Sequence, residues 1–184
     1  MIDAEKTIKR IAIDLANLNP VDVAMQEFRT THDLGGELSA TGFPRSMSER
    51  FRLGSPDGRT LFLRDLAQRL WSGGGDEGGI EILQRFLFPA GEAAVDRVRI
   101  DWRRQRLAYQ PKTTLQAVFY YLLQNSNLAK ICGNPECTHR YFFGKRANER
   151  YCSDACFEIG QRSSKKNWWN EHGKEWREYR RTKP

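Results

Sequence analysis

The feature that most constrains this chain is a group of four cysteines within one short segment near the C-terminus. They form two close pairs with the spacing C-x4-C-x14-C-x3-C, namely Cys132 with Cys137 and Cys152 with Cys156. Two pairs of thiols at such spacings match structural zinc sites, in which four thiolates surround the ion tetrahedrally. Because four filled positions leave no room for a reactive water, we predict one structural Zn²⁺ held by these ligands.

The residues between the cysteines indicate a small finger fold. Residues 133–135 (Gly-Asn-Pro) suit the tight turn that lets two cysteines converge on one ion. We predict a strand at 140–143, a returning strand at 150–151, and a helix that Ser153 or Asp154 caps. Such a treble-clef-like finger of about 40 residues buries too little surface to fold alone, so its stability should depend on the metal. The alternative is four buried or redox-active cysteines without a metal.

The chain divides into two predicted domains, residues 1–126 and 127–184. We expect the first to be an α+β domain that is mainly helical, with short hairpins. Apolar residues recur at helical spacing in four segments: 3–18, 65–71, 80–88 and 113–125. In the last of these, Thr113 and Gln116 match a capping box, which makes it the clearest helix.

Strand and loop signals complete the first domain. Alternating residues predict a pair of strands within 98–109, and the turn Ser-Pro-Asp-Gly at 55–58 predicts a hairpin between its apolar neighbours. Polar or glycine-rich composition predicts loops at 30–50 and 72–79. The expected fold class is therefore α+β, followed by a zinc finger that ends in a helix.

Positive charge is concentrated in the part of the chain that holds the cysteines. The whole chain has 30 Lys or Arg and 23 Asp or Glu, a formal net charge of +7. Residues 127–184 contain 13 of the former and 7 of the latter, a net charge of +6. Such asymmetry between the two parts points to a negatively charged partner, such as nucleic acid or another acidic surface.

The predicted C-terminal helix places cations around an aromatic residue. At about 100° per residue, three cations of this helix surround Trp169, and the turn before the helix adds more. Cations neutralise phosphates, and an exposed aromatic ring can stack on a base or wedge between base pairs. The candidate nucleic-acid-binding residues are Lys145, Arg146, Arg150, Arg162, Lys165, Lys166 and Trp169.

The same helix has a second interpretation. Glu158 and Arg162 are four residues apart and further glutamates follow, which is typical of a helix that only faces solvent. The three tryptophans of the helix would then dock it on the first domain, and we expect at least two of them to be packed. Gly173 predicts an interruption of the helix.

The cysteine segment resembles the bacterial CGNR zinc finger or a sister group of treble-clef fingers. The resemblance rests on Asn134-Pro-Glu-Cys137, on the aromatic strand 141–143, on Arg150-Tyr-Cys-Ser153 and on the apolar helix before them. In that family a larger region called the ABATE domain usually precedes the finger. The resemblance covers roughly a quarter of the chain, and it implies zinc binding by the four cysteines and a role in DNA binding and transcription regulation. The motif that names the family is replaced here, since Phe-Glu-Ile follows Cys156.

Three functions are open at this point. The first is a transcription regulator that binds double-stranded DNA through the finger, while residues 1–126 sense a small ligand or form a homodimer. The second is a protein-interaction module in which zinc is purely structural. The third is a small metal-dependent nuclease. We expect no enzymatic activity, because the three histidines lie in unrelated contexts and the sequence has no nucleophile elbow, Walker motif, dinucleotide fingerprint or His-Glu-x-x-His.

The sequence also predicts where the protein resides. The longest apolar run, 117–123, is far shorter than the roughly 20 residues that span a bilayer, and the first residues carry charge where a signal peptide is apolar. We therefore expect a cytoplasmic protein without membrane association, whose thiols stay reduced and available to a metal.

Overall fold

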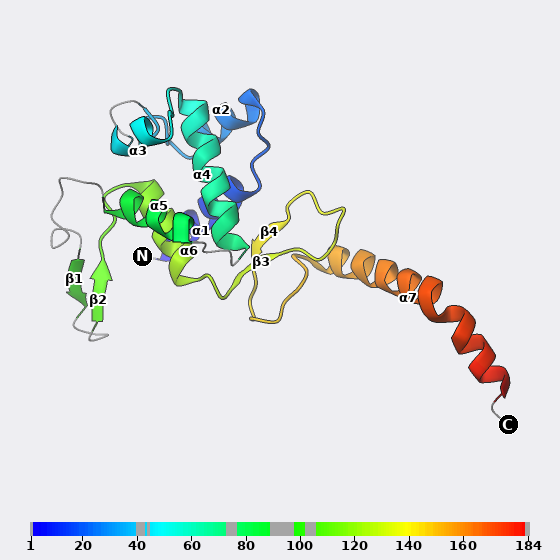
Figure 1. The fold of residues 1–184 in the computed structure, drawn as a ribbon. Coiled ribbons are helices and arrows are strands. Elements are labelled where there is room, and N and C mark those ends of the chain that lie inside the picture. The colour runs from blue at the N-terminus through cyan, green and yellow to red at the C-terminus, as the bar shows by residue number, and fades with distance from the viewer. Residues whose placement is uncertain are drawn as a thin grey trace.

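The computed structural model describes residues 2–39, 43, 45–72, 77–88, 98–101 and 106–182. Within these ranges the helices are α1 (Ile2–Ala16), α2 (Asp22–Thr31), α3 (Arg45–Arg50), α4 (Pro56–Trp71), α5 (Glu77–Leu87), α6 (Thr114–Gln124) and α7 (Asp154–Thr182). The strands are β1 (Val98–Asp101), β2 (Arg106–Tyr109), β3 (Ala129–Ile131) and β4 (Tyr141–Phe143). The fold is thus mostly helical with two small hairpins and a long C-terminal helix (Figure 1).

The hydrophobic core lies between α1, α4, α5 and α6. Leu15 of α1, Leu63 of α4 and Phe119 of α6 are completely buried. The ring of Phe86 in α5 meets Phe119 edge-on, with 5.3 Å between the ring centroids. Each helix therefore presents one apolar face to the others, and the helices predicted at 3–18, 80–88 and 113–125 are confirmed.

Thr113 caps α6 as predicted. Its Oγ1 accepts a hydrogen bond from the N–H of Gln116 at 3.2 Å. The side chain of Gln116 reaches back to the N–H of Lys112, at 3.1 Å, and so forms a variant of the expected capping box. The carboxylate of Glu37 accepts from the first two N–H groups of the helix at 2.7 and 2.9 Å. The negative charge of Glu37 interacts favourably with the positive end of the α6 dipole, and its two hydrogen bonds attach the segment after α2 to α6.

The Ser-Pro-Asp-Gly segment begins α4, so the hairpin predicted there is wrong. The Oγ of Ser55 accepts from the N–H of Gly58 at 3.0 Å, and Pro56 lies in the first turn, where its missing N–H is no loss. A Ser-Pro pair starts a helix as readily as it makes a turn. The buried residues that follow have helical spacing: Leu63, Leu66, Ala67 and Trp71. The helix predicted at 65–71 is the second half of α4.

The loop predicted at 30–50 is wrong at both ends. Helix α2 continues to Thr31, and α3 occupies the last six residues of the segment. The buried side chains of Leu34, Leu38 and Met47 attach it to the core, which outweighs its polar composition. The loop predicted at 72–79 is also too long, because α5 begins at Glu77; residues 73–76 lie outside the described residues.

The pair of strands predicted within 98–109 is confirmed. Strands β1 and β2 are antiparallel, with Val98 opposite Tyr109 and Asp101 opposite Arg106; residues 102–105 lie outside the described residues. The hydroxyl of Tyr109 donates to the carbonyl of Leu87 at 2.7 Å. This bond fastens the hairpin to the end of α5.

The second hairpin differs from the one predicted around the cysteines. The strand predicted at 140–143 is confirmed as β4, but its partner is β3, with Ala129 opposite Phe143 and Ile131 opposite Tyr141. The returning strand predicted at 150–151 is wrong. Ala129 and Phe143 are both buried in the core, so the hairpin on either side of the first cysteine pair gains burial that residues 150–151 lack.

Helices α1 and α4 hold this hairpin from the side. The side-chain amide of Asn17, directly after α1, donates to the carbonyl of Tyr141 at 2.8 Å and accepts from its N–H at 3.0 Å. The indole N–H of Trp71, the last residue of α4, donates to the carbonyl of Phe142 at 3.2 Å. The bonds of Asn17 satisfy the edge of β4 that β3 leaves open, and Trp71 adds a second donor to a carbonyl on the edge that faces β3. The domain boundary predicted between residues 126 and 127 stays a prediction, and contacts in the core cross it.

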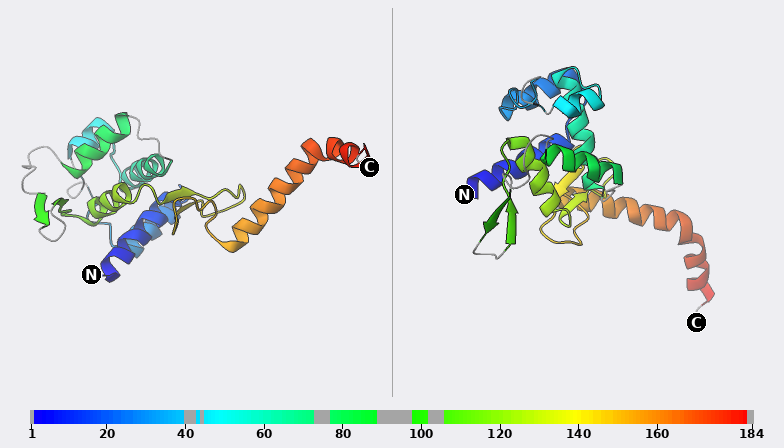
Figure 2. Two further views of the ribbon diagram at one scale, coloured as in Figure 1. Left: turned by 90° about the horizontal axis from the view of Figure 1, so that it is seen from below. Right: turned by 60° about the vertical axis from the view of Figure 1, so that its left-hand side comes forward.

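Helix α7 extends away from the rest of the molecule. Its first turn lies beside the β3–β4 hairpin and its other end is far from every other element (Figures 1 and 2). The helix continues through Gly173 to Thr182, so the predicted interruption is wrong, although the ribbon bends in its C-terminal part (Figure 2). None of the helices in the described ranges combines the length and the apolar character needed to cross a membrane.

We predict that Asn17→Ala lowers the free energy of unfolding by about 2 kcal/mol, because two hydrogen bonds to β4 are lost and the strand's polar groups stay partly buried. Urea denaturation of the two proteins measures the difference. Asn19→Ala is the matched control, since the side chain of Asn19 is exposed, and it should change stability by less than about 0.5 kcal/mol. An equal effect of the two changes would contradict the role given to Asn17.

Candidate metal centre

The Sγ atoms of all four cysteines lie within 4.8 Å of one another. The Sγ atom of Cys152 lies 3.6 Å from that of Cys137 and 3.5 Å from that of Cys156. These distances exclude disulfide bonds, which are about 2.05 Å long. Tetrahedral zinc with Zn–S bonds of about 2.3 Å needs sulfurs about 3.8 Å apart. The cluster is therefore close to the geometry that a single metal ion requires, and the predicted ligands do come together.

Two tight turns bring the first pair of cysteines into the cluster. The N–H of Cys132 donates to the carbonyl of Arg140 at 2.7 Å, which extends the β3–β4 pairing to the first ligand. The carbonyl of Asn134 accepts from the N–H of Cys137 at 3.2 Å, and its side-chain oxygen accepts from the N–H of Glu136 at 3.1 Å. Asn134 is buried and organises this turn, which confirms the turn predicted at 133–135.

The second pair of cysteines belongs to the start of α7. Cys152 precedes the helix, and Cys156 lies in its first turn. The Oγ of Ser153 accepts from the N–H of Cys156 at 3.3 Å, so Ser153 is the predicted cap. The N–H of Gly133 donates to the carbonyl of Arg150 at 2.8 Å and joins the two halves of the cluster. Helix α7 is thus oriented by the same residues that hold the thiols.

The thiols differ in how readily they lose a proton. Asn134 and then Ser153 hydrogen-bond to the side chain of Cys156 and lower its pKa to about 6; the amide Nδ2 of Asn134 is 3.4 Å from the sulfur. Burial, followed by the neighbouring thiols, raises the pKa of Cys152 to about 12. Burial also raises the pKa of Cys137. The thiolate of Cys156 forms easily, whereas those of Cys137 and Cys152 need a nearby cation, so the set of donors fits a metal that binds thiolates.

Tyr151 packs the start of α7 against the first turn of the cluster. Its ring lies between two glycines: a Cβ atom on Gly160 would be 2.3 Å from the ring, and one on Gly133 would be 3.3 Å away. Phe157 meets the same ring edge-on, with 5.6 Å between centroids. Sequence reasoning missed this contact. The signal that could have found it is a glycine within an otherwise helical segment, where glycine is costly without a packing reason.

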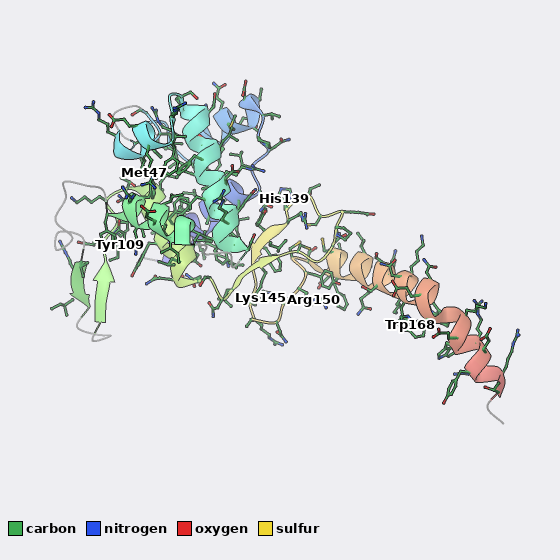
Figure 3. The ribbon with its side chains drawn as sticks, in the orientation of Figure 1. Met47, Tyr109, His139, Lys145, Arg150 and Trp168 are labelled. Atoms are coloured by element: carbon green, nitrogen blue, oxygen red, sulfur yellow. The ribbon has the colours of Figure 1, made fainter. Side chains whose placement is uncertain are left out.

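The predicted cations are exposed and come from two elements. Lys145, Arg146 and Arg150 belong to the loop between β4 and α7, and Figure 3 shows Lys145 and Arg150 beside this loop. The other predicted residues, Arg162, Lys165, Lys166 and Trp169, lie on α7 and are also exposed. The guanidinium of Arg162 is 3.5 Å from the carboxylate of Glu158, so the charge pair typical of a solvent-facing helix is present too.

An open groove lies between the loop and the start of α7. Its volume is about 680 Å³, and its lining includes Lys145, Arg150, Tyr151 and Phe157. Cationic and aromatic side chains therefore line one depression directly at Cys152, together with the carboxylates of Glu149 and Asp154. Sequence reasoning did not predict the groove, because it depends on how α7 leaves the cluster.

The tryptophans of α7 do not dock on the helical body. Trp168, Trp169 and Trp176 are 43%, 47% and 37% exposed, so the expectation that at least two are packed is wrong. They pack on one another instead, with 5.1 Å between the ring centroids of Trp168 and Trp169 and 5.2 Å between those of Trp169 and Trp176. The reason is the direction of α7, which carries these rings away from any other described element.

The side chains of the histidines are not part of the cysteine cluster. His139 is exposed in the turn after Cys137 and is 3.1 Å from the hydroxyl of Thr138. His32 is 3.1 Å from the carboxylate of Asp14 in α1, and His172 lies on α7. Among the described residues the metal-binding group consists of the four cysteines alone. Comparison of the chain with protein-family models, curated proteins and solved structures finds no significant match.

We predict that Gly160→Ala destabilises the protein by about 1–3 kcal/mol, because the new methyl group overlaps the ring of Tyr151. The gain in helix propensity, about 1 kcal/mol, is smaller. Ser163→Ala on the exposed face of α7 is the control and should change stability little. In a Tyr151→Ala background the glycine substitution should add no further cost when urea unfolding is measured. Additive effects of the two substitutions would show that they do not act through one contact.

Proposed function

We propose that this chain is a zinc protein and a DNA-binding transcription regulator, in which one structural Zn²⁺ presents a basic surface to double-stranded DNA. The observation that carries the proposal is the position of the exposed cations around the four-thiol cluster. Three of them occupy the loop that ends at Cys152, and three more lie on the first half of α7, which begins between Cys152 and Cys156. Any metal bound by the thiols fixes both groups relative to each other.

Zinc is the metal that the donor set favours. Four sulfur ligands in a near-tetrahedral cluster suit an ion without redox chemistry or a geometric preference of its own. With four protein ligands no coordination position is free for water, which supports a structural role and no catalysis. The resemblance of the cysteine segment to CGNR-type fingers points the same way.

DNA fits the exposed surface in charge and shape. Lysine and arginine side chains neutralise phosphates and release counterions, which provides affinity without sequence information. The loop and α7 project from the body, so a duplex can reach them without meeting the helical domain (Figure 1). Trp169 is exposed beside these cations and offers a ring for contact with the groove. The remaining residues, 1–126, would then sense a ligand in the cytoplasm.

A protein-interaction module with structural zinc is the second proposal. The ion pair between Glu158 and Arg162 and the exposed tryptophans favour it, because protein interfaces are rich in tryptophan and arginine. This alternative predicts the same zinc content as the first. It differs in predicting no salt-dependent binding to DNA.

We predict that the protein purifies with one zinc per chain and that Cys152→Ser loses it and unfolds the segment around the cluster. Three thiolates bind the ion less tightly, and the remaining buried groups lose their common ligand. Inductively coupled plasma mass spectrometry and circular dichroism check the two effects. Thr138→Ala, an exposed change beside Cys137, is the control and should keep the zinc. Full zinc and an unchanged melting curve in Cys152→Ser would refute the four-cysteine site.

We predict that the triple variant Arg162→Glu, Lys165→Glu and Lys166→Glu binds a labelled DNA duplex at least about tenfold more weakly at low salt. The slope of log affinity against log salt should become smaller by about 0.9 for each phosphate contact removed. Fluorescence anisotropy at several salt concentrations measures both quantities, and the zinc content should stay unchanged.

A matched control reverses three exposed cations of the helical body, Lys6→Glu, Arg10→Glu and Arg99→Glu. This control changes the net charge of the protein by the same amount as the α7 variant. It therefore shows how much of any loss of affinity comes from the long-range attraction between the protein and DNA. If the α7 variant keeps the wild-type slope, α7 is not the DNA-binding surface. If the wild-type protein does not bind DNA even at low salt, the protein-interaction alternative replaces the regulator.

A further inference from the structure

Helix α7 is long and almost entirely unsupported. Its 29 residues span about 44 Å, yet only Gly160 and Gly173 are buried. Among the described elements, α7 makes no extensive contact with another helix or strand. Helices in water depend largely on the packing of an apolar face for their stability. A helix that leaves the body in this way therefore points to a partner outside the chain.

Aromatic residues gather on one side of this helix. Phe157, Trp168 and Tyr179 recur every 11 residues, which is close to three helical turns and keeps them in line. His172 stacks on Trp168 with 5.6 Å between ring centroids, and the ring of Trp169 covers Gly173. We define the aromatic stripe by the aromatic residues on this side: Phe157, Trp168, Trp169, His172, Trp176 and Tyr179. Each of them is more than one third exposed. Glu158 and Lys165 lie on the same side in the first half of the helix, so the stripe is free of charge within its width only from Trp168 onward.

Charges of opposite sign flank the aromatic stripe. At about 100° per residue, one edge holds only carboxylates and the other only cations. The acidic row consists of Glu171, Glu175 and Glu178. The basic row consists of Arg162, Lys166, Arg177 and Arg180. The guanidinium of Arg180 lies over the ring of Trp176 at 4.6 Å, which places this cation at the border of the stripe.

We propose that α7 pairs with α7 of a second copy of this chain, in parallel orientation, so that the two aromatic stripes cover each other. In a parallel pair the left edge of one helix faces the right edge of the other, so each acidic row meets a basic row. In an antiparallel pair like rows would face each other. The 11-residue period, 3.67 residues per turn, is close to that of a straight helix and needs little supercoiling.

The acidic row also disfavours DNA and anionic membranes as partners of the aromatic stripe. Three carboxylates beside the aromatic rings repel both DNA phosphates and an anionic membrane surface. The helix of another copy is the partner that supplies a basic row for the acidic one and an acidic row for the basic one. Within the described residues Glu175 and Glu178 have no ion-pair partner, so both are available for this contact.

The parallel pair predicts a particular contact between subunits. In two parallel helices in register, a residue on one edge faces the residue about five positions later on the opposite edge. Glu175 would then face Arg180 of the partner subunit, and the symmetric contact would occur twice. The cations nearest the cysteines, Lys145 and Arg150, lie at the other end of α7 and stay free. The pairing would bring two metal modules to one end of the dimer. It shares Arg162, Lys166 and Trp169 with the proposed DNA surface, so it is tested without DNA.

The test is the association state of the full, zinc-loaded protein without DNA, measured by sedimentation equilibrium. We expect a dimer whose dissociation constant rises about tenfold in Glu175→Lys and in Arg180→Glu, because each places like charges together twice. The double variant Glu175→Lys with Arg180→Glu reverses the pair and should recover the wild-type constant. Glu136→Lys, an exposed change near the cysteines, is the control and should leave the constant unchanged.

Each other outcome overturns a part of the proposal. A monomer at concentrations of tens of micromolar refutes the pairing, and the aromatic stripe then serves a different partner. Tighter association in both single variants indicates antiparallel helices, in which the like rows become attractive. A dimer that no α7 substitution affects places the interface elsewhere. Circular dichroism of each variant confirms that these exposed substitutions leave the helix content unchanged.

Discussion

The convergence of four sulfur atoms determines how the two parts of this molecule are joined. The first cysteine pair lies in the connection of the β3–β4 hairpin, which Asn17, Trp71 and the core hold in place. The second pair and all of α7 are connected to that hairpin through the thiol cluster, the bond from Gly133 to Arg150, and the ring of Tyr151. Because burial raises the pKa of the Cys137 and Cys152 thiols, a bound cation would favour their thiolates and keep the cluster closed.

This arrangement gives α7 two regions with different chemistry. The first half lies close to the cluster and carries exposed cations, as does the loop that precedes it. An aromatic stripe between an acidic and a basic row begins at Phe157 and is densest in the second half. The proposals of DNA binding and of pairing share Arg162, Lys166 and Trp169, whereas the loop cations Lys145, Arg146 and Arg150 belong to DNA binding alone.

Sequence reasoning succeeded where the signal was local. The grouping of the four cysteines, the cap of α6 and the strands β1 and β2 follow from spacing and from residue types that have one dominant use. It failed where one signal allows two structures. Ser55 and Pro56 suit both a turn and a helix start, and the buried residues of α4 decided for the helix. The partner of β4 was wrong because burial of Ala129, which spacing alone does not reveal, favoured β3 over residues 150–151.

The sequence by itself determined which atoms could bind a metal, since two cysteine pairs with turn residues between them have few other uses in a reducing environment. It also determined that the excess positive charge lies in residues 127–184, the part of the chain that contains the cysteines. Only the tertiary structure decided where α7 points, because this depends on the packing of Tyr151 between Gly133 and Gly160, three positions far apart in the chain. That direction leaves the tryptophans exposed. Composition alone suggested that the tryptophans would be buried. That expectation failed because the surroundings of a residue depend on how the elements are oriented as well as on its own hydrophobicity.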